Sequence, residues 1–177
     1  MGIALVLAIR LVVPLAILRW PFWGTLATLL TDGVDIIIFQ LTEFPGDEYQ
    51  RIDKLLDGWY MLLQFVVVQR WDAPARWVLN ALFAYRLLGA ALYELSGTRE
   101  LLVLFPNAFT FYFTFVAGVR KFRPAYRLTP RRHAAWLIAI LLPTLLLEYA
   151  LHWARWFDDW RAVDIIEDMI DAIVPGA

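Results

Sequence analysis

Residues 75–95, ARWVLNALFAYRLLGAALYEL, decide the fold class, because they form a long apolar run with a break at each end. Pro74 precedes the run and Ser96-Gly97 follows it, and both are typical boundaries of a helix. A bilayer core of roughly 30 Å requires about 20 predominantly apolar residues in a helix. This run is long enough, and it predicts a membrane-spanning helix.

Similar apolar runs, separated by proline, glycine or charged residues, occur along most of the chain. They predict further helices at residues 3–18, 22–41, 51–68, 100–119 and 133–155. The 177 residues are 61% hydrophobic, with a mean hydropathy of +0.59, whereas an ordinary soluble domain is about 45–50% apolar. We therefore expect an all-α integral membrane protein, with about six transmembrane helices in a compact bundle over residues 1–157.

The last segment, residues 158–177, is acidic, and its apolar residues recur at helical spacing. Val163, Ile166, Ile170 and Ile173 would share one face, which predicts a short C-terminal amphipathic helix. The chain has no cysteine, which excludes disulfides and cysteine-ligated metal centres. Its net charge of −1 gives no reason to expect nucleic acid as a partner. We expect a multi-pass protein of the cell (inner) membrane that contacts lipid, as a homodimer or as a subunit of a larger membrane complex.

The loop between the last two predicted helices, residues 120–132, is strongly basic. Its cationic side chains are Arg120, Lys121, Arg123, Arg127, Arg131 and Arg132. Because basic loops stay in the cytoplasm, this loop predicts a cytoplasmic location for itself and an outside location for both termini. Binding of anionic lipid head groups is the alternative role for the same charges.

Four aspartates lie in or beside the second and third predicted helices. Asp32 and Asp35 are three residues apart and Asp53 and Asp57 are four apart, so each pair lies on one helix face. The connection between these helices is short, so we expect antiparallel neighbours whose acidic faces meet. A charge near the centre of a bilayer costs roughly 2.5–3.5 kcal/mol on insertion scales, so it needs a partner, water or an ion. Clustered carboxylates suit a hard divalent cation, Mg²⁺ or Mn²⁺, although helix capping is the simpler explanation for Asp53.

Other polar residues extend this acidic seam. Thr25 and Thr28 lie along the second helix, and Tyr60 and Gln64 lie along the third. We expect Tyr60 and Gln64 to contact a substrate. Arg86 lies midway along residues 75–95. An arginine inside a membrane has an acidic partner or a phosphate ligand. It is therefore either a structural ion pair with one of the aspartates or a catalytic clamp on a lipid phosphate.

The spacing of the acids resembles the signature of the CDP-alcohol phosphatidyltransferases, D-x2-D-G-x2-A-R-x8-G-x3-D-x3-D. In this chain the corresponding residues are Asp32-x2-Asp35-Ile36-x2-Phe39-Gln40-x8-Tyr49-x3-Asp53-x3-Asp57. Members of that family have six transmembrane helices, and the signature lies across the second and third. The resemblance rests on residues 32–57, and all four acids match its register without a gap.

This resemblance implies a transferase that depends on a divalent metal and acts on a phospholipid or a diphosphate-linked lipid. It implies that Asp32, Asp35 and Asp53 bind Mg²⁺ or Mn²⁺. Asp57 would complete the metal site and remove the proton from the attacking alcohol. Gln40 stands where the family has its arginine, and it would contact the substrate.

The chain also departs from the family's signature. Ile36, Phe39 and Tyr49 replace two glycines and an alanine, and these small residues make room for the cytidine nucleotide in the family. The bulky side chains favour an alternative, in which the protein is not catalytic. It would then bind or conduct a cation, or serve as a subunit of a larger membrane complex.

Overall fold

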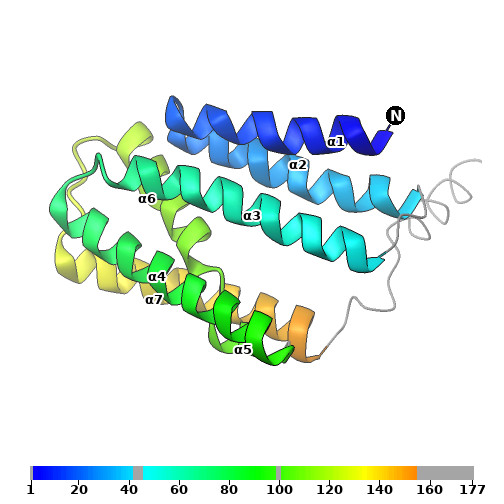
Figure 1. Cartoon of the computed structure of the whole chain (residues 1–177). Coiled ribbons are helices and arrows are strands. Elements are labelled where there is room, and N and C mark those ends of the chain that lie inside the picture. Colours follow the sequence, from blue (N-terminus) through cyan, green and yellow to red (C-terminus); the bar gives the residue numbers. More distant parts are fainter. Residues whose placement is uncertain (1, 42–45, 99–100, 155–177) are drawn as a thin grey trace, which may run out of the picture.

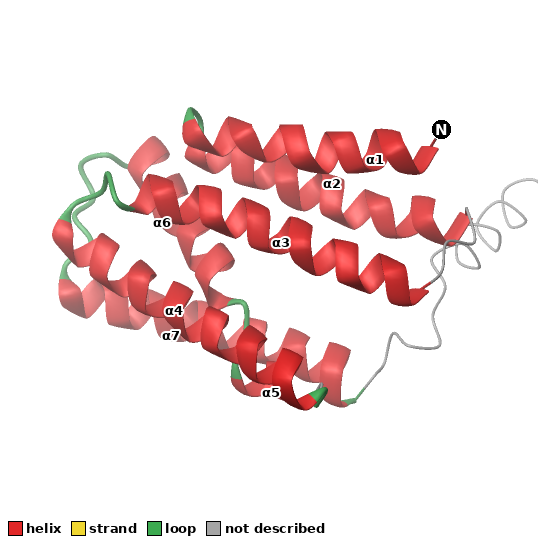
Figure 2. Cartoon of the chain, viewed as in Figure 1, coloured by secondary structure: helices red, strands yellow, loops and turns green. Residues whose placement is uncertain are grey.

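The computed structural model describes residues 2–41, 46–98 and 101–154, and every regular element in these ranges is a helix (Figure 2). The longer α-helices are α1 Gly2–Val12, α2 Pro21–Leu41, α3 Gly46–Val68, α4 Ala73–Ser96, α6 Ala108–Phe122 and α7 Pro130–Glu148. The shorter elements are the 3₁₀ helix η1 Val13–Leu18, the single turn α5 Leu101–Leu104 and the π-helix η2 Tyr149–Trp153. The all-helical prediction is confirmed for these residues, and the predicted tail helix lies outside them.

Proline and glycine determine where these helices begin and end. Pro21 and Pro130 are the first residues of α2 and α7, and Pro74 lies in the first turn of α4. Proline suits this position because the first N–H groups of a helix have no partner within it. Gly97 ends α4 with a φ of 69°, a left-handed conformation that glycine adopts without strain.

The structure differs from the prediction at residues 100–119, which form two helices instead of one. α5 ends at Leu104, and α6 begins at Ala108 after an irregular segment that contains Pro106. Proline has no N–H to donate and its ring clashes with the preceding turn, so the helix cannot continue through it. The chain redirects there, and α6 enters the interior of the bundle.

α6 is the central helix of the bundle, and it packs against α2, α3, α4 and α7. Phe109, Tyr112, Phe113 and Val116 on α6 are completely buried. The ring of Trp71 stacks on Phe113 with its centroid 5.0 Å away. The outer helices form two groups, with α1, α2 and α3 side by side and α4 beside α7 (Figure 1).

Three of the connections lie together at one end of the bundle, to the left in Figure 1. They are the α1–α2, α3–α4 and α6–α7 connections, and we call this the basic end. Its arginines and lysine are Arg19, Arg70, Arg120, Lys121, Arg123, Arg127, Arg131 and Arg132. The start of α1, the end of α2 and the start of α3 lie at the opposite end (Figure 1).

Within the described ranges, α4 alone is both long enough and apolar enough to cross a membrane by length and composition. Residues 4–18 form a shorter apolar helix. Large apolar side chains are nevertheless exposed on the long helices. Leu5, Leu30, Leu55, Leu95 and Leu146, on α1, α2, α3, α4 and α7, are all at least 62% exposed.

Candidate functional site

Arg10 and three aspartates form an ion-pair cluster between α1, α2 and α3, which we call the Arg10 cluster (Arg10, Asp32, Asp53 and Asp57). The Arg10 guanidinium donates to Asp53 Oδ1 at 2.6 Å and to Asp57 Oδ1 at 3.2 Å, and it also forms an ion pair with Asp32. Arg10 is only 4% exposed, whereas each aspartate side chain is 32% exposed. The predicted meeting of the acidic faces is therefore observed for these three aspartates.

Local helix geometry explains why these side chains meet. Asp53 and Asp57 lie one turn apart on α3, so they project from the same face. α2 packs against α3, which brings Asp32 to that face, and α1 packs against both helices. The side chain of Asp35 lies outside the described residues, as do those of Ile36, Phe39, Gln40 and Tyr49.

The donor atoms of the cluster suit a divalent cation, but their arrangement does not. One carboxylate oxygen each from Asp32, Asp53 and Asp57 lies within 4.8 Å of the other two. Carboxylate oxygens bind Mg²⁺ or Ca²⁺ at about 2.0–2.6 Å. Arg10 already contacts all three carboxylates, and its positive charge would repel a metal ion placed between them. The residues as arranged fit an arginine, and a metal ion would fit only if Arg10 moved away.

The rest of the predicted seam continues into the interior as a chain of hydrogen bonds. Gln64 is completely buried; its Nε2 donates to Thr25 Oγ1 at 3.3 Å, and its Oε1 accepts from Thr110 Oγ1 at 3.2 Å. Tyr60 is 3% exposed and belongs to the apolar core. Both side chains contact protein in this structure, and their contact with a substrate stays a prediction.

A cavity of about 510 Å³ lies between α3 and α4 beside the Arg10 cluster, and we call it the α3–α4 cavity. Asp57 and Arg86 line it together, so the two residues predicted for catalysis border one space. Arg86 Nη1 donates to the Phe105 carbonyl at 2.6 Å and lies 3.8 Å from Glu148 Oε1. The ion-pair partner of Arg86 in the structure is therefore Glu148, and not an aspartate as the sequence suggested.

The other charges at this cavity also form a pair. Lys54 Nζ lies 3.1 Å from Glu94 Oε1 and 4.1 Å from the centre of the Tyr93 ring. Lys54 and Arg86 thus face Asp57 and Glu94 in one cavity, with two charges of each sign. The remaining wall is largely apolar and includes Met61, Leu87 and Ala90.

Comparison with protein-family models, with curated proteins and with solved structures found no match for this chain. From the sequence, Arg10 is a charge inside an apolar helix that has no acid of its own among residues 2–18, so it either pairs with an acid of another helix or reaches the interface. The structure shows the pairing, and the contact of Arg10 with three aspartates at once is the feature that the sequence did not show.

Proposed function

We propose that the protein is a polytopic membrane protein in which α1 with η1, α2, α3, α4, α6 and α7 cross the bilayer. Support comes from the exposed leucines on the long helices, because soluble monomers rarely expose large apolar surfaces. α2, α3 and α4 contain 21, 23 and 24 residues. At 1.5 Å per residue they are about 32–36 Å long, which matches a bilayer core of roughly 30 Å. The charges of the Arg10 cluster lower the hydropathy of α2 and α3, but they pair with one another between the helices.

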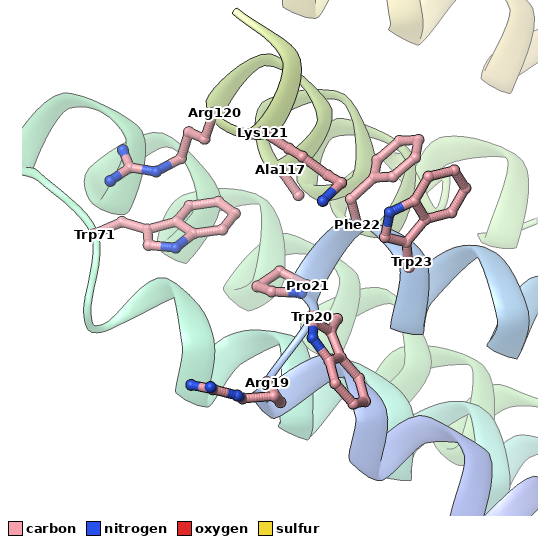
Figure 3. Close-up of a pocket in the computed structure, with 9 residues that line it drawn as sticks. All are labelled: Arg19, Trp20, Pro21, Phe22, Trp23, Trp71, Ala117, Arg120 and Lys121. Carbon is pink, nitrogen blue, oxygen red and sulfur yellow. The ribbon is translucent and has the colours of Figure 1, made fainter. Parts of the chain in front are cut away.

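In this proposal the basic end faces the cytoplasm. The positive-inside rule favours this orientation, because the three connections and the adjoining helix ends carry Arg19, Arg70, Arg120, Lys121, Arg123, Arg127, Arg131 and Arg132. Figure 3 shows Arg19, Arg120 and Lys121 there among Trp20, Trp23 and Trp71, around a small cavity of about 250 Å³. Tryptophan beside basic side chains is typical of a membrane–water interface.

The acids then lie away from the cytoplasmic end. α3 begins at the end opposite the basic end, and Asp53 and Asp57 lie in its first half (Figure 1). A transferase that uses a soluble cytoplasmic nucleotide needs its metal site near the cytoplasmic surface. This placement supports a role other than nucleotide-dependent transfer.

We propose that the protein binds a membrane lipid in the α3–α4 cavity without catalysing a reaction on it. The observation that carries this proposal is the contact of Arg10 with all three aspartates, because the guanidinium then occupies the space between the carboxylates and offsets part of their charge. The ion pairs of the Arg10 cluster hold α1 and α2 against α3. They thereby fix the position of Asp57, which lines the α3–α4 cavity.

The chemistry of the cavity favours a lipid with a zwitterionic head group. Its volume of about 510 Å³ lies in the usual range for ligand sites. The two positive side chains, Lys54 and Arg86, balance the two negative ones, Asp57 and Glu94, so the cavity exerts no net electrostatic attraction on an anionic head group. Its apolar wall suits the glycerol backbone and the upper acyl chain.

Two glycine substitutions test this proposal. Gly58 lines the cavity, and a Cβ added there would meet no atom within 4 Å, so Gly58→Leu can place its side chain in the cavity. Gly33 on α2 has the same open surroundings but does not line the cavity, so Gly33→Leu is the matched control. The measurement is native mass spectrometry of protein released from membranes of phosphatidylethanolamine. We expect Gly58→Leu to lose the retained lipid and Gly33→Leu to keep it; equal retention in both would refute the proposal.

The second candidate is the metal-dependent transferase that the acid spacing suggested. It is favoured by the proximity of three carboxylate oxygens within 4.8 Å and by Asp57 at the edge of the cavity. The test is transfer of a labelled group from a CDP-linked lipid in membranes that contain Mn²⁺. Transfer that is lost in Asp53→Asn and in Asp57→Asn would replace the first proposal with this one.

A further inference from the structure

A second large cavity lies at the basic end, far along α3 from the Arg10 cluster. Its volume is about 590 Å³, and we call it the arginine cavity. Arg120, Arg123 and Arg127 line it from the end of α6 and the following loop, and His133 lines it from α7. The start of α4 completes the wall with Asp72. Neither the lipid-binding proposal nor the transferase alternative uses any of these residues.

The arginine cavity carries more positive charge than its own acid neutralises. Arg120 forms an ion pair with Asp72 and lies 5.3 Å from the centre of the Trp71 ring (Figure 3). Arg123 and Arg127 have no acidic partner among the residues that the structure describes. Two guanidinium groups therefore face this cavity without a counter-charge from residues 2–41, 46–98 or 101–154.

His133 provides an independent indication of a missing ligand. The residue is 2% exposed, and its Nδ1 lies 2.7 Å from the Tyr112 hydroxyl. Its Nε2 is buried and has no hydrogen-bond partner in the described part of the chain. The Tyr112 hydroxyl also lies 3.2 Å from the His133 carbonyl, so it can donate either to that oxygen or to Nδ1. In the tautomer in which Nδ1 accepts from Tyr112, Nε2 carries the proton and is a donor. Buried polar atoms are normally paired, so in this tautomer the Nε2 proton supports an acceptor ligand in the cationic cavity.

The helix ends around the cavity add to this field. α4 and α7 both begin at its wall, with Pro74 and Pro130 among the lining residues. The N-terminus of a helix is positive and presents free N–H groups. Thr129, which precedes α7, makes no side-chain hydrogen bond that would cap these groups.

We propose that the arginine cavity binds the phosphate of a phosphate ester, with Arg123 and Arg127 as its main charged contacts and His133 as a buried donor. Arginine suits this role because its planar guanidinium pairs with two phosphate oxygens at once. The ester is either the head group of an anionic phospholipid or a small phosphorylated molecule from the aqueous phase. Both share the phosphate chemistry, and the experiment distinguishes the two sources.

The experiment uses the full chain in nanodiscs and two probes. One arm titrates glycerol 3-phosphate into protein in phosphatidylcholine nanodiscs. The other measures, by native mass spectrometry, retention of phosphatidylglycerol from nanodiscs that contain equal amounts of it and phosphatidylcholine. Binding in the first arm identifies a soluble ester, and selective retention in the second alone identifies a lipid. No binding in either arm would overturn the proposal.

Charge-matched double variants test which arginines are responsible. Each arginine near an anionic group is worth about 1 kcal/mol, so R123Q with R127Q should weaken binding about 30-fold. The control is R76Q with R131Q, because neither Arg76 nor Arg131 lines the arginine cavity. All four arginines are solvent-facing or partly so, and the variants should fold. Equal weakening in both double variants would mean diffuse surface attraction and would overturn the proposal.

A spectroscopic readout tests the part played by His133. The chain has 2 histidines, so the His152→Gln variant leaves His133 as the only imidazole signal under selective ¹⁵N labelling. Addition of the probe that binds should shift the Nε2 resonance of His133. An unchanged resonance at saturating probe would exclude the buried donor and with it this site.

Discussion

Replacement of Arg10 by methionine should destabilise the protein by about 3 kcal/mol. Methionine keeps much of the apolar volume but removes the three contacts, at 2.6 Å to Asp53, at 3.2 Å to Asp57 and to Asp32. Removal of one partner from a buried ion pair costs about 3–5 kcal/mol, because the other charge is left without compensation. The aspartate side chains are 32% exposed, so water solvates the charges that lose their partner, and we expect a destabilisation at the lower end of this 3–5 kcal/mol range.

The assay is thermal unfolding in detergent, followed by tryptophan fluorescence. For a chain of this size, 3 kcal/mol corresponds to a decrease of about 6–12 °C in the midpoint. Arg76→Met is the control, because Arg76 has no ion pair among the described residues. The sharper comparison adds Asp57→Asn, which should destabilise the wild type but stabilise Arg10→Met by removing a repelling charge. A loss below about 1 kcal/mol in Arg10→Met, or the same effect of Asp57→Asn in both backgrounds, would refute this reasoning.

Three further predictions concern packing, buried polarity and pH. A Cβ at Gly24 would collide with the backbone of η1, so Gly24→Ala should lower the free energy of unfolding by about 1–3 kcal/mol. A Cβ at Gly33 would meet no atom within 4 Å, so Gly33→Ala should raise the free energy of unfolding by up to about 1 kcal/mol. The midpoints of thermal unfolding of the two variants should therefore move in opposite directions. Gln64→Leu leaves the buried hydroxyls of Thr25 and Thr110 without their shared partner, so it should lower the free energy of unfolding by about 1–3 kcal/mol. An unchanged free energy of unfolding in the same assay would show that the hydrogen-bond chain does not contribute to stability. The hydrogen bond from Arg120 lowers the pKa of Asp72 below its usual 3.8. The ionised Asp72 therefore stabilises the folded protein above pH 3.8, and this stabilisation is lost as the pH falls through the lowered pKa. Melts at pH 3 and pH 7 should show a smaller gap between wild type and Asp72→Asn at pH 3, and a gap of equal size at both would contradict the assignment.

The acidic seam was largely predictable from sequence, because it depends on local geometry. Spacings of three and four residues place side chains on one helix face whatever the rest of the fold does. A short connection then brings α2 against α3, and the structure duly places Asp32 beside Asp53 and Asp57. The same reasoning placed Gln64 on the seam, where it contacts Thr25.

The position of Arg10 could not be predicted in the same way. Its helix carries no acid, so no spacing rule links it to a partner. Which face of α1 meets α2 and α3 depends on packing between elements far apart in sequence, and this is decided by the shape of many apolar side chains together. The α3–α4 cavity is likewise a product of packing, since its walls come from residues some 30 positions apart, such as Asp57 and Arg86.

Helix boundaries were predictable where proline or glycine separates two apolar runs and not where proline lies inside one. Pro74 and Gly97 mark the ends of α4 closely. Pro106 divides the predicted helix over residues 100–119, whereas Pro143 lies inside α7 without ending it. The surroundings of the two prolines differ, because Pro106 is buried whereas Pro143 is exposed.

The most direct test of the account is the binding of Mn²⁺ to the wild type and to Arg10→Met, measured by electron paramagnetic resonance as the loss of the free-ion signal. We expect no specific site in the wild type, because the Arg10 guanidinium already contacts all three carboxylates and would repel an ion placed between them. We expect Arg10→Met to gain one Mn²⁺ per chain, since the carboxylate oxygens within 4.8 Å of one another are then available. One Mn²⁺ per chain in the wild type, lost in Asp53→Asn, would contradict the account and favour the metal-dependent enzyme.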